Sequence, residues 1–303
     1  MNKLIIALFG LLLLGGCTAQ TTTDDARIRV VTTIGMITDI VQNVGGDYVR
    51  VTGLMGPGVD PHLYKTSEGD VRAMSSTDII FYNGLHLESK MGDVIEGMEQ
   101  LTHVVAVTDY LNKSELLDFP AFPGQYDPHV WFNVKYWMNA TQKVRDELIR
   151  YDPAHAQYYK DNAQTYQAGL EALDAYVTAQ IQRVPEQQRV LITAHDAFSY
   201  FGREYGLDVR GLQGISTEAQ AGTGDVQELV DFIVLQKIKA IFIESSVPER
   251  NIKAVEEAVE AKGWNVSIGG ELFSDAMGDA GTFEGTYIGM VTHNVDTIVG
   301  ALS

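Results

Sequence analysis

The chain has 303 residues, of which 45% are hydrophobic and 20% are charged, so it can form one large globular domain or two of medium size. Its formal net charge is −18, and the sequence contains no run of basic residues. This composition argues against nucleic acid as a partner, because phosphate binding needs clustered lysine and arginine.

The first residues have the pattern of an export signal. Lys3 precedes an apolar run at residues 4–14, which is too short to span a bilayer as a helix and has the length of a signal-peptide core. A Gly-Cys pair ending at Cys17, the only cysteine, resembles the lipobox of bacterial lipoproteins. We therefore predict a signal peptide at residues 1–16, a lipid on Cys17, and a polar tether at residues 17–26 that holds the protein at a membrane surface. The alternative is an ordinary secretory signal in which the cysteine occurs by chance.

The part of the chain after the tether alternates short β-branched runs with longer amphipathic segments. We predict strands at residues 29–33, 49–54, 78–82 and 104–107, with helices at residues 38–44, 67–75 and 91–101. Strands that alternate with helices indicate βα units and a mostly parallel sheet.

The middle of the chain has helical patterns and no strand. We predict helices at residues 134–150 and 153–182, separated by Asp152-Pro153, where proline suits a first helical turn. The second helix would be about 45 Å long. Lying between two blocks of βα units, it is interpreted as a rigid connector; the alternative is a helical hairpin packed within one domain.

A second α/β block follows. We predict strands at residues 190–193, 209–212, 240–243 and 265–268, with helices at residues 197–205, 225–236, 249–262 and 286–302. The predicted fold is therefore α/β, with two lobes at residues 27–152 and 185–303, each a mostly parallel sheet flanked by helices. One long rigid helix at residues 153–184 joins them.

Three histidines and one aspartate stand out as candidate ligands. His62 and His129 each end an Asp-Pro-His tripeptide, which makes a stiff loop that presents the imidazole in one direction. His195 directly follows a predicted strand, where open α/β sheets place their ligand crevices. Asp275 follows the last predicted strand. Two lobes facing each other would bring the four side chains together in the cleft.

This ligand set suits Zn²⁺ or Mn²⁺. Three imidazoles and one carboxylate offer nitrogen and oxygen donors to a borderline divalent ion, whereas Mg²⁺ or Ca²⁺ would need more oxygen ligands. We expect one bound ion. Asp60 and Asp127 are candidates for hydrogen bonds that orient the histidines beside them.

At these residues the chain resembles the metal-binding receptors of bacterial ABC importers that are classed as cluster A-I (cluster 9). The resemblance covers nearly the whole mature chain and is most specific at residues 193–207, 241–246 and 269–290. It implies two α/β lobes joined by a helix, and ligands at His62, His129, His195 and Asp275.

The resemblance also implies partners and a location. A receptor of this kind acts in the cell envelope, as a lipid-anchored monomer facing the periplasm or the cell exterior, and delivers its ion to an ABC permease with its ATPase. The histidine at position 195 favours zinc within the family. The segment between the first two ligands lacks the long His-rich loop of zinc-dedicated relatives, so exclusive zinc binding is not implied.

Two other functions compete with metal capture. A zinc hydrolase would keep an open coordination position for water and would need a general base, for which Glu244 is available. A lipid-anchored adhesin or a receptor for an organic solute would need aromatic walls in its cleft, and Trp131 could supply one. We predict a binding protein without catalytic activity.

Overall fold

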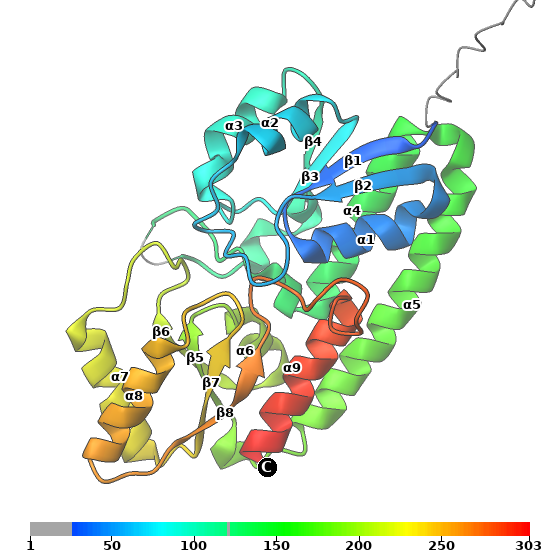
Figure 1. The fold of residues 1–303 in the computed structure, drawn as a ribbon. Helices are drawn as coiled ribbons and strands as arrows, with labels where there is room; N and C mark the ends of the chain where they lie inside the picture. Colours follow the sequence, from blue (N-terminus) through cyan, green and yellow to red (C-terminus); the bar gives the residue numbers. More distant parts are fainter. Residues whose placement is uncertain (1–25, 120–121) are drawn as a thin grey trace, which may run out of the picture.

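The computed structural model describes residues 26–119 and 122–303, and it has the predicted α/β organisation in two lobes (Figure 1). The predicted signal peptide, Cys17 and all but the last residue of the predicted tether lie outside the described residues. Within the described part, none of the helices is both long and apolar enough to cross a bilayer.

The N-terminal lobe is built on a parallel sheet with the strand order β2-β1-β3-β4. Its elements are β1 (Ile28–Thr32), α1 (Gly35–Gly45), β2 (Val49–Gly53), α2 (Glu68–Ser75), β3 (Ile79–Tyr82), α3 (Gly92–Met98), β4 (His103–Ala106) and α4 (Val134–Tyr151). The central strand β3 buries its first three side chains in succession, as expected for a strand that is covered on both faces.

The C-terminal lobe has a similar arrangement, but its four strands form two separate two-stranded sheets. Its elements are β5 (Val190–His195), α6 (Ser199–Tyr205), β6 (Asp208–Gln213), α7 (Thr223–Gln236), β7 (Ala240–Glu244), α8 (Arg250–Ala261), β8 (Ser267–Leu272) and α9 (Tyr287–Leu302). β5 pairs with β6 and β7 pairs with β8, both in parallel, and β5 lies beside β7. The spatial order β6-β5-β7-β8 thus mirrors β2-β1-β3-β4. In both lobes the carboxyl ends of the strands face the junction between the lobes (Figure 1).

One long helix joins the lobes. α5 (Ala156–Ile181) follows a 3₁₀ turn at Pro153–His155, so the predicted helical segment is confirmed with a tighter first turn. α5 packs against α1 and α4 in the N-terminal lobe and against α9 in the C-terminal lobe. The alternative of a helical hairpin within one domain accounts for the packing of α4 on α5. It does not account for the rest of α5, which continues beyond α4 into the second lobe (Figure 1). Its 26 residues correspond to about 39 Å.

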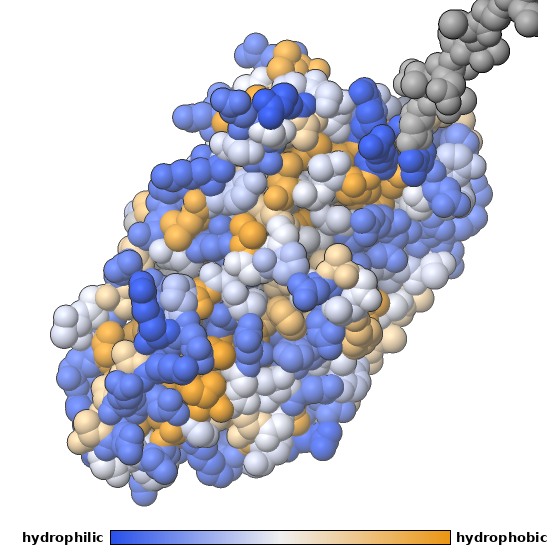
Figure 2. All heavy atoms as spheres, in the orientation of Figure 1, coloured by the Kyte–Doolittle hydropathy of each residue, from blue (hydrophilic) through white to orange (hydrophobic). Residues whose placement is uncertain are grey.

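The hydrophobic core crosses the junction without a break. A single group of buried apolar side chains extends from the β1–β4 sheet through α4 and α5 to α9, and a smaller group lies between β5–β8, α7 and α8. Trp137 of α4 stacks on Tyr287 of α9 with ring centroids 5.3 Å apart. Outside this core, the face drawn in Figure 2 is mostly hydrophilic, with hydrophobic residues in small separate groups. A shared core of this kind opposes wide separation of the two lobes, because separation would expose packed apolar side chains to water.

The last strand differs from the sequence prediction. β8 extends through Gly269 and Gly270, which we expected in a loop. A Cβ atom at Gly269 would lie 2.8 Å from side chains of β7 and α9, and one at Gly270 would lie 2.5 Å from Thr297 of α9. The two glycines therefore allow α9 to approach the strand closely, and this packing maintains the strand where local preference would end it.

Candidate metal centre

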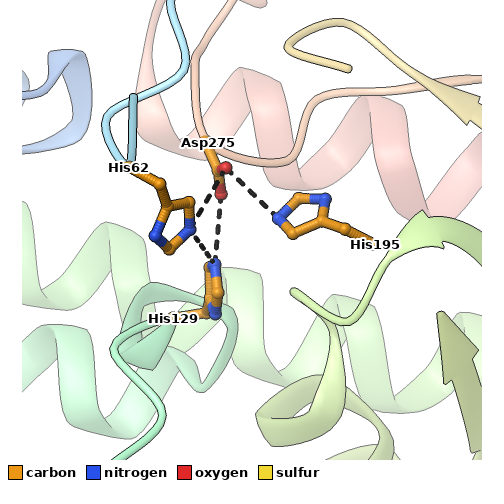
Figure 3. Close-up of side chains that lie close together, drawn as sticks. All are labelled: His62, His129, His195 and Asp275. Atoms are coloured by element: carbon orange, nitrogen blue, oxygen red, sulfur yellow. Dashed lines mark hydrogen bonds and ion pairs between the residues drawn. The ribbon is translucent and has the colours of Figure 1, made fainter. Parts of the chain in front are cut away.

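Four side chains from separate parts of the chain meet between the lobes (Figure 3). His62 comes from the loop after β2 and His129 from the loop before α4, both in the N-terminal lobe. His195 is the last residue of β5, and Asp275 lies in the loop after β8. All four are buried, with exposed fractions between 0% and 2%. The structure thus brings together all four candidate ligands from the sequence.

The donor atoms of this group have the spacing of a metal site. One atom from each residue lies within 4.8 Å of all the others. Nε2 of His62 is 3.2 Å from Nε2 of His129, and Oδ2 of Asp275 is 3.7 Å from Nε2 of His62 and 3.2 Å from Nε2 of His195. In a tetrahedral zinc site with bonds of about 2.0–2.1 Å, neighbouring ligand atoms are about 3.3–3.4 Å apart. The group could therefore hold one small cation.

Several of these buried donor atoms have no hydrogen-bond partner. Nε2 of His195 and both carboxylate oxygens of Asp275 make no hydrogen bond within the described residues. The carboxylate of Asp275 instead lies 3.7, 3.4 and 3.2 Å from Nε2 of the three histidines. A cation at the centre would give all these donor atoms a shared partner and offset the cost of their burial.

The electrostatics of the group also favour a cation. Burial lowers the pKa of both His129 and His195, but the carboxylates around them outweigh it. Asp127 and Asp275 raise the pKa of His129 to about 9, and Glu244 and Asp275 raise the pKa of His195 well above its ordinary value. Burial acts to raise the pKa of Asp275, yet the two histidines hold it well below its usual range. The site attracts positive charge, which a divalent ion supplies when the histidines are neutral ligands.

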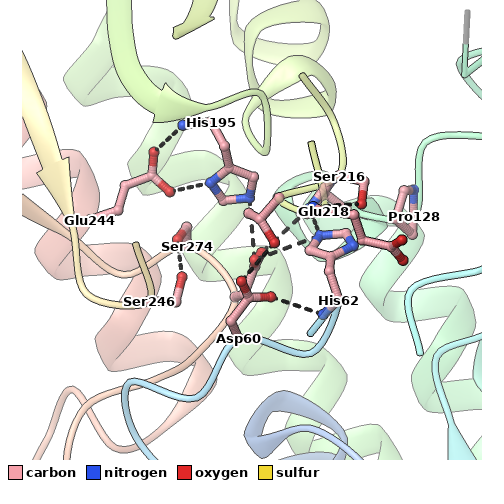
Figure 4. Close-up of polar contacts among 12 residues, drawn as sticks. Asp60, His62, Pro128, His195, Ser216, Glu218, Glu244, Ser246 and Ser274 are labelled. Carbon is pink, nitrogen blue, oxygen red and sulfur yellow. Dashed lines mark hydrogen bonds and ion pairs between the residues drawn. The ribbon is translucent and has the colours of Figure 1, made fainter. Parts of the chain in front are cut away.

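Two carboxylates orient two of the histidines through Nδ1, the ring nitrogen that faces away from the centre. Asp127 accepts hydrogen bonds from the backbone N–H of His129, at 2.9 Å, and from its Nδ1, at 2.8 Å. Glu244 accepts from the backbone N–H of His195 at 2.9 Å and from its Nδ1 (Figure 4). Both rings are therefore held with Nε2 directed at the centre, as is usual for metal-binding histidines.

The third histidine is held differently. Asp60 accepts a hydrogen bond from the backbone N–H of His62 at 2.9 Å, so the Asp-Pro-His turn has the same form as at Asp127. The other oxygen of Asp60 accepts from Thr217 Oγ1 in the opposite lobe, at 2.6 Å, and not from the imidazole. Asp60 therefore orients the backbone of His62, as expected, but it does not hold the ring, because its second oxygen accepts from Thr217 across the cleft. Burial lowers the pKa of His62 to about 3.

Comparison with known proteins identifies the family. The family model described as "Zinc-uptake complex component A periplasmic", or ZnuA, matches residues 30–301. The chain belongs to the ZnuA family. Two curated relatives of this ZnuA-family protein are the zinc-binding protein TroA of Treponema pallidum and the manganese-binding lipoprotein MntA of Bacillus subtilis. TroA is 52% identical over 92% of this chain and 90% of its own length, and MntA is 47% identical over 97% of each.

A solved structure has the same fold. The periplasmic zinc-binding protein TroA from Treponema pallidum superimposes with a TM-score of 0.89 at 52% identity, covering 91% of this chain and 99% of that one. The sequence-based fold class and family resemblance are therefore both confirmed.

Sequence reasoning missed two supports of the centre. Glu244 was considered as a general base, but in this ZnuA-family chain both its oxygens bind His195. Trp131 donates its indole N–H to the carbonyl of Ser274, across the lobe junction. A glutamate at the end of a buried strand is a signal for the first support. The second depends on a contact between residues far apart in the sequence, so no local pattern reveals it.

Proposed function

We propose that this protein captures one Zn²⁺ or Mn²⁺ ion outside the cytoplasmic membrane and delivers it to an ABC-type permease and its ATPase for import. The ligands in this proposal are His62, His129, His195 and Asp275. The observation that carries it is the convergence of four buried donor atoms within 4.8 Å of one another. Relatives named as zinc-binding and manganese-binding proteins support the same class of cargo.

The donor set favours a borderline divalent ion and admits both metals. Three imidazole nitrogens and one carboxylate suit Zn²⁺ as a tetrahedral ligand set. The second oxygen of Asp275 has no hydrogen-bond partner in the described structure, so it is free to join the coordination of Mn²⁺, which prefers more oxygen ligands.

A binding role fits the centre better than hydrolysis. Catalytic zinc has three protein ligands and keeps one position for water, whereas here four side chains surround the central point. Glu244, the available general base, has both oxygens hydrogen-bonded to His195. We therefore propose that the protein is not an enzyme.

A receptor for a larger organic molecule is also disfavoured. Trp131, two residues after His129, is 0% exposed, and its N–H is bound to Ser274. It therefore offers no wall to a sugar or a peptide. Cargo of atomic size is what the buried group can enclose.

For its location, we propose a lipid anchor on Cys17 that holds a monomeric receptor at a membrane of the cell envelope, facing the periplasm or the cell exterior. The support is the sequence pattern around the cysteine and the printed names of relatives such as the manganese-binding lipoprotein MntA. Mass spectrometry of the membrane fraction tests it: a diacylglyceryl adduct on Cys17 is expected, and Cys17→Ala should release the chain from the membrane.

Titration of Zn²⁺ and Mn²⁺ into the metal-stripped protein tests the proposed function. Wild type should bind one ion per chain, and alanine at any of the three histidines should weaken binding by more than about 100-fold, since loss of an outer hydrogen-bond partner alone costs about 10–100-fold. His103→Gln is a matched control, because His103 hydrogen-bonds Glu147 away from the centre. Equal binding in wild type and ligand variants would overturn the proposal.

A further inference from the structure

The segment at residues 83–89, between β3 and α3, has an unusual backbone. Gly84, Leu85 and His86 have φ values of 86°, 53° and 65°, so three consecutive residues are left-handed. Across residues 26–119 and 122–303, the only other non-glycine residue with positive φ is Lys237. Each left-handed non-glycine residue costs about 1–2 kcal/mol, and such strain persists only where the surroundings enforce it.

A buried carboxylate enforces this conformation. Glu88, 4% exposed, accepts hydrogen bonds from the backbone N–H of Asn83 at 2.7 Å and of Gly84 at 3.2 Å. It also accepts from Oγ1 of Thr33, directly after β1, at 2.7 Å. Thr108 donates to the carbonyl of Asn83 at 2.7 Å. Glu88 therefore holds the left-handed turn together through two of its backbone N–H groups, and it joins the turn to the carboxyl end of β1 through Thr33.

The pinned segment contacts both ligand loops of the N-terminal lobe. Nδ2 of Asn83 donates to the carbonyl oxygen of Pro128 at 3.0 Å, in the residue directly before His129. At the other end, Oγ of Ser89 lies 3.4 Å from the carbonyl oxygen of His62.

The same end of the segment reaches the opposite lobe. Ser89 donates to Glu218 at 2.6 Å, and Nζ of Lys90 lies 2.7 Å from the other oxygen of Glu218. Glu218 belongs to the loop after β6 and appears beside His62 in Figure 4. One strained turn thus touches the backbone of two ligand loops and one loop of the C-terminal lobe.

We propose that Glu88 is a positioning residue for the metal centre. Glu88 holds residues 84–86 in their left-handed conformation and so places the side-chain amide of Asn83 against the carbonyl of Pro128. This contact fixes the position of the loop that carries His129 and the direction of its ring. Glu88 touches no ligand side chain and acts through Asn83. This inference rests on the proposed function, because it concerns the ligand geometry of that centre.

Two variants and a control test it. Glu88→Gln keeps the size of the side chain but replaces one acceptor oxygen by a donor. Asn83→Ala leaves Glu88 in place and removes the amide that donates to the carbonyl of Pro128 and, at 3.1 Å, to that of Gly84. Thr77→Val is the control, because it removes a partly buried hydrogen bond to the backbone carbonyl of Arg29, at 2.7 Å, at the opposite end of β3. Zn²⁺ affinity is measured by competition with a chelator at a temperature at which all variants are folded, and the visible spectrum of the Co²⁺-loaded protein reports the ligand geometry.

We expect Glu88→Gln and Asn83→Ala each to weaken Zn²⁺ binding by about 10–100-fold and to change the intensity or position of the Co²⁺ bands. The double variant should lose less than the product of the two effects, because both residues act through the same contact. Thr77→Val should lower the melting temperature and leave affinity and spectrum unchanged.

A lowered melting temperature with unchanged affinity and spectrum in both site variants would overturn the proposal. If Glu88→Gln does not fold, Asn83→Ala decides by itself. Failure of wild type to bind Zn²⁺ would instead contradict the proposed function, so the two failures are distinguishable.

Discussion

Trp131 of the N-terminal lobe donates its indole N–H to the carbonyl oxygen of Ser274 of the C-terminal lobe, at 3.1 Å. Trp131 lies two residues after His129, and Ser274 directly precedes Asp275. The hydroxyl of Tyr287 donates to the carbonyl of Trp131 at 2.6 Å. Ligand loops from different lobes are therefore tied to each other by hydrogen bonds that do not involve a metal.

Removing this tie should weaken metal binding modestly. Trp131→Phe keeps an aromatic ring but loses the N–H, and a hydrogen bond contributes about 0.5–1.5 kcal/mol, so we expect a loss of roughly 2–12-fold in Zn²⁺ affinity. Trp264→Phe is the matched control, because Trp264 also donates its indole N–H to a backbone carbonyl, that of Ile238 at 2.7 Å, outside the ligand loops. Competition with a chelator measures the Zn²⁺ affinity of both variants. An equal loss of affinity in the two would show that the hydrogen bond between the ligand loops has no specific role.

Loss of the carboxylate behind His195 should have a larger effect. Glu244→Gln leaves one oxygen for the two hydrogen bonds that Glu244 now accepts, so the ring is held less firmly and is less basic. We expect about 10–100-fold weaker Zn²⁺ binding. Glu249→Gln, which affects only an exposed pair with Lys253, should leave affinity unchanged. Wild-type affinity in Glu244→Gln would contradict the orienting role.

The shared core predicts how little the lobes move. Trp137 and Tyr287 stack across the junction, and Tyr166 of α5 donates to the buried carboxylate of Asp39 at 2.6 Å. Opening the lobes widely would expose this core to water. We therefore expect small-angle X-ray scattering of metal-free and Zn²⁺-loaded protein to give the same radius of gyration within error. A clear expansion on metal removal would contradict this and indicate a hinge.

Acid should weaken the junction between β1 and β3. Hydrogen bonds from Arg29 lower the pKa of Asp78, so this carboxylate stabilises the fold above its unfolded pKa of about 4, and that stability is lost as pH falls through the lower folded value. Because Arg29 is half exposed, Asp78→Asn should lower the free energy of unfolding at pH 7 by less than about 1 kcal/mol. Urea unfolding should show this difference between wild type and variant at pH 7 and a smaller difference at pH 3. A difference that grows as the pH falls would contradict the stabilising role of the Asp78 carboxylate.

The sequence predicts the parts of the site that are locally determined. The turns at His62 and His129 follow from Asp-Pro-His, since in each the aspartate accepts from the histidine N–H. His195 follows from the end of a strand. Asp275 has no local signature, so its place among the candidate ligands depends on the family resemblance.

Contacts between distant residues decide the rest. Glu244 reaches His195 because β5 lies beside β7, which strand prediction alone does not establish. The left-handed turn at Leu85 and His86 opposes local preference and exists because Glu88 and Thr33 hold it. β8 continues through Gly269 and Gly270 because α9 packs closely on it. In each case tertiary packing overrides the local pattern.

Anomalous diffraction at the zinc edge, from crystals of the Zn²⁺-loaded protein, tests the central claim most directly. We predict a single strong peak between the lobes, about 2.0–2.2 Å from Nε2 of His62, His129 and His195 and from a carboxylate oxygen of Asp275. A peak elsewhere, or one that lacks two or more of these four ligands, would contradict the account.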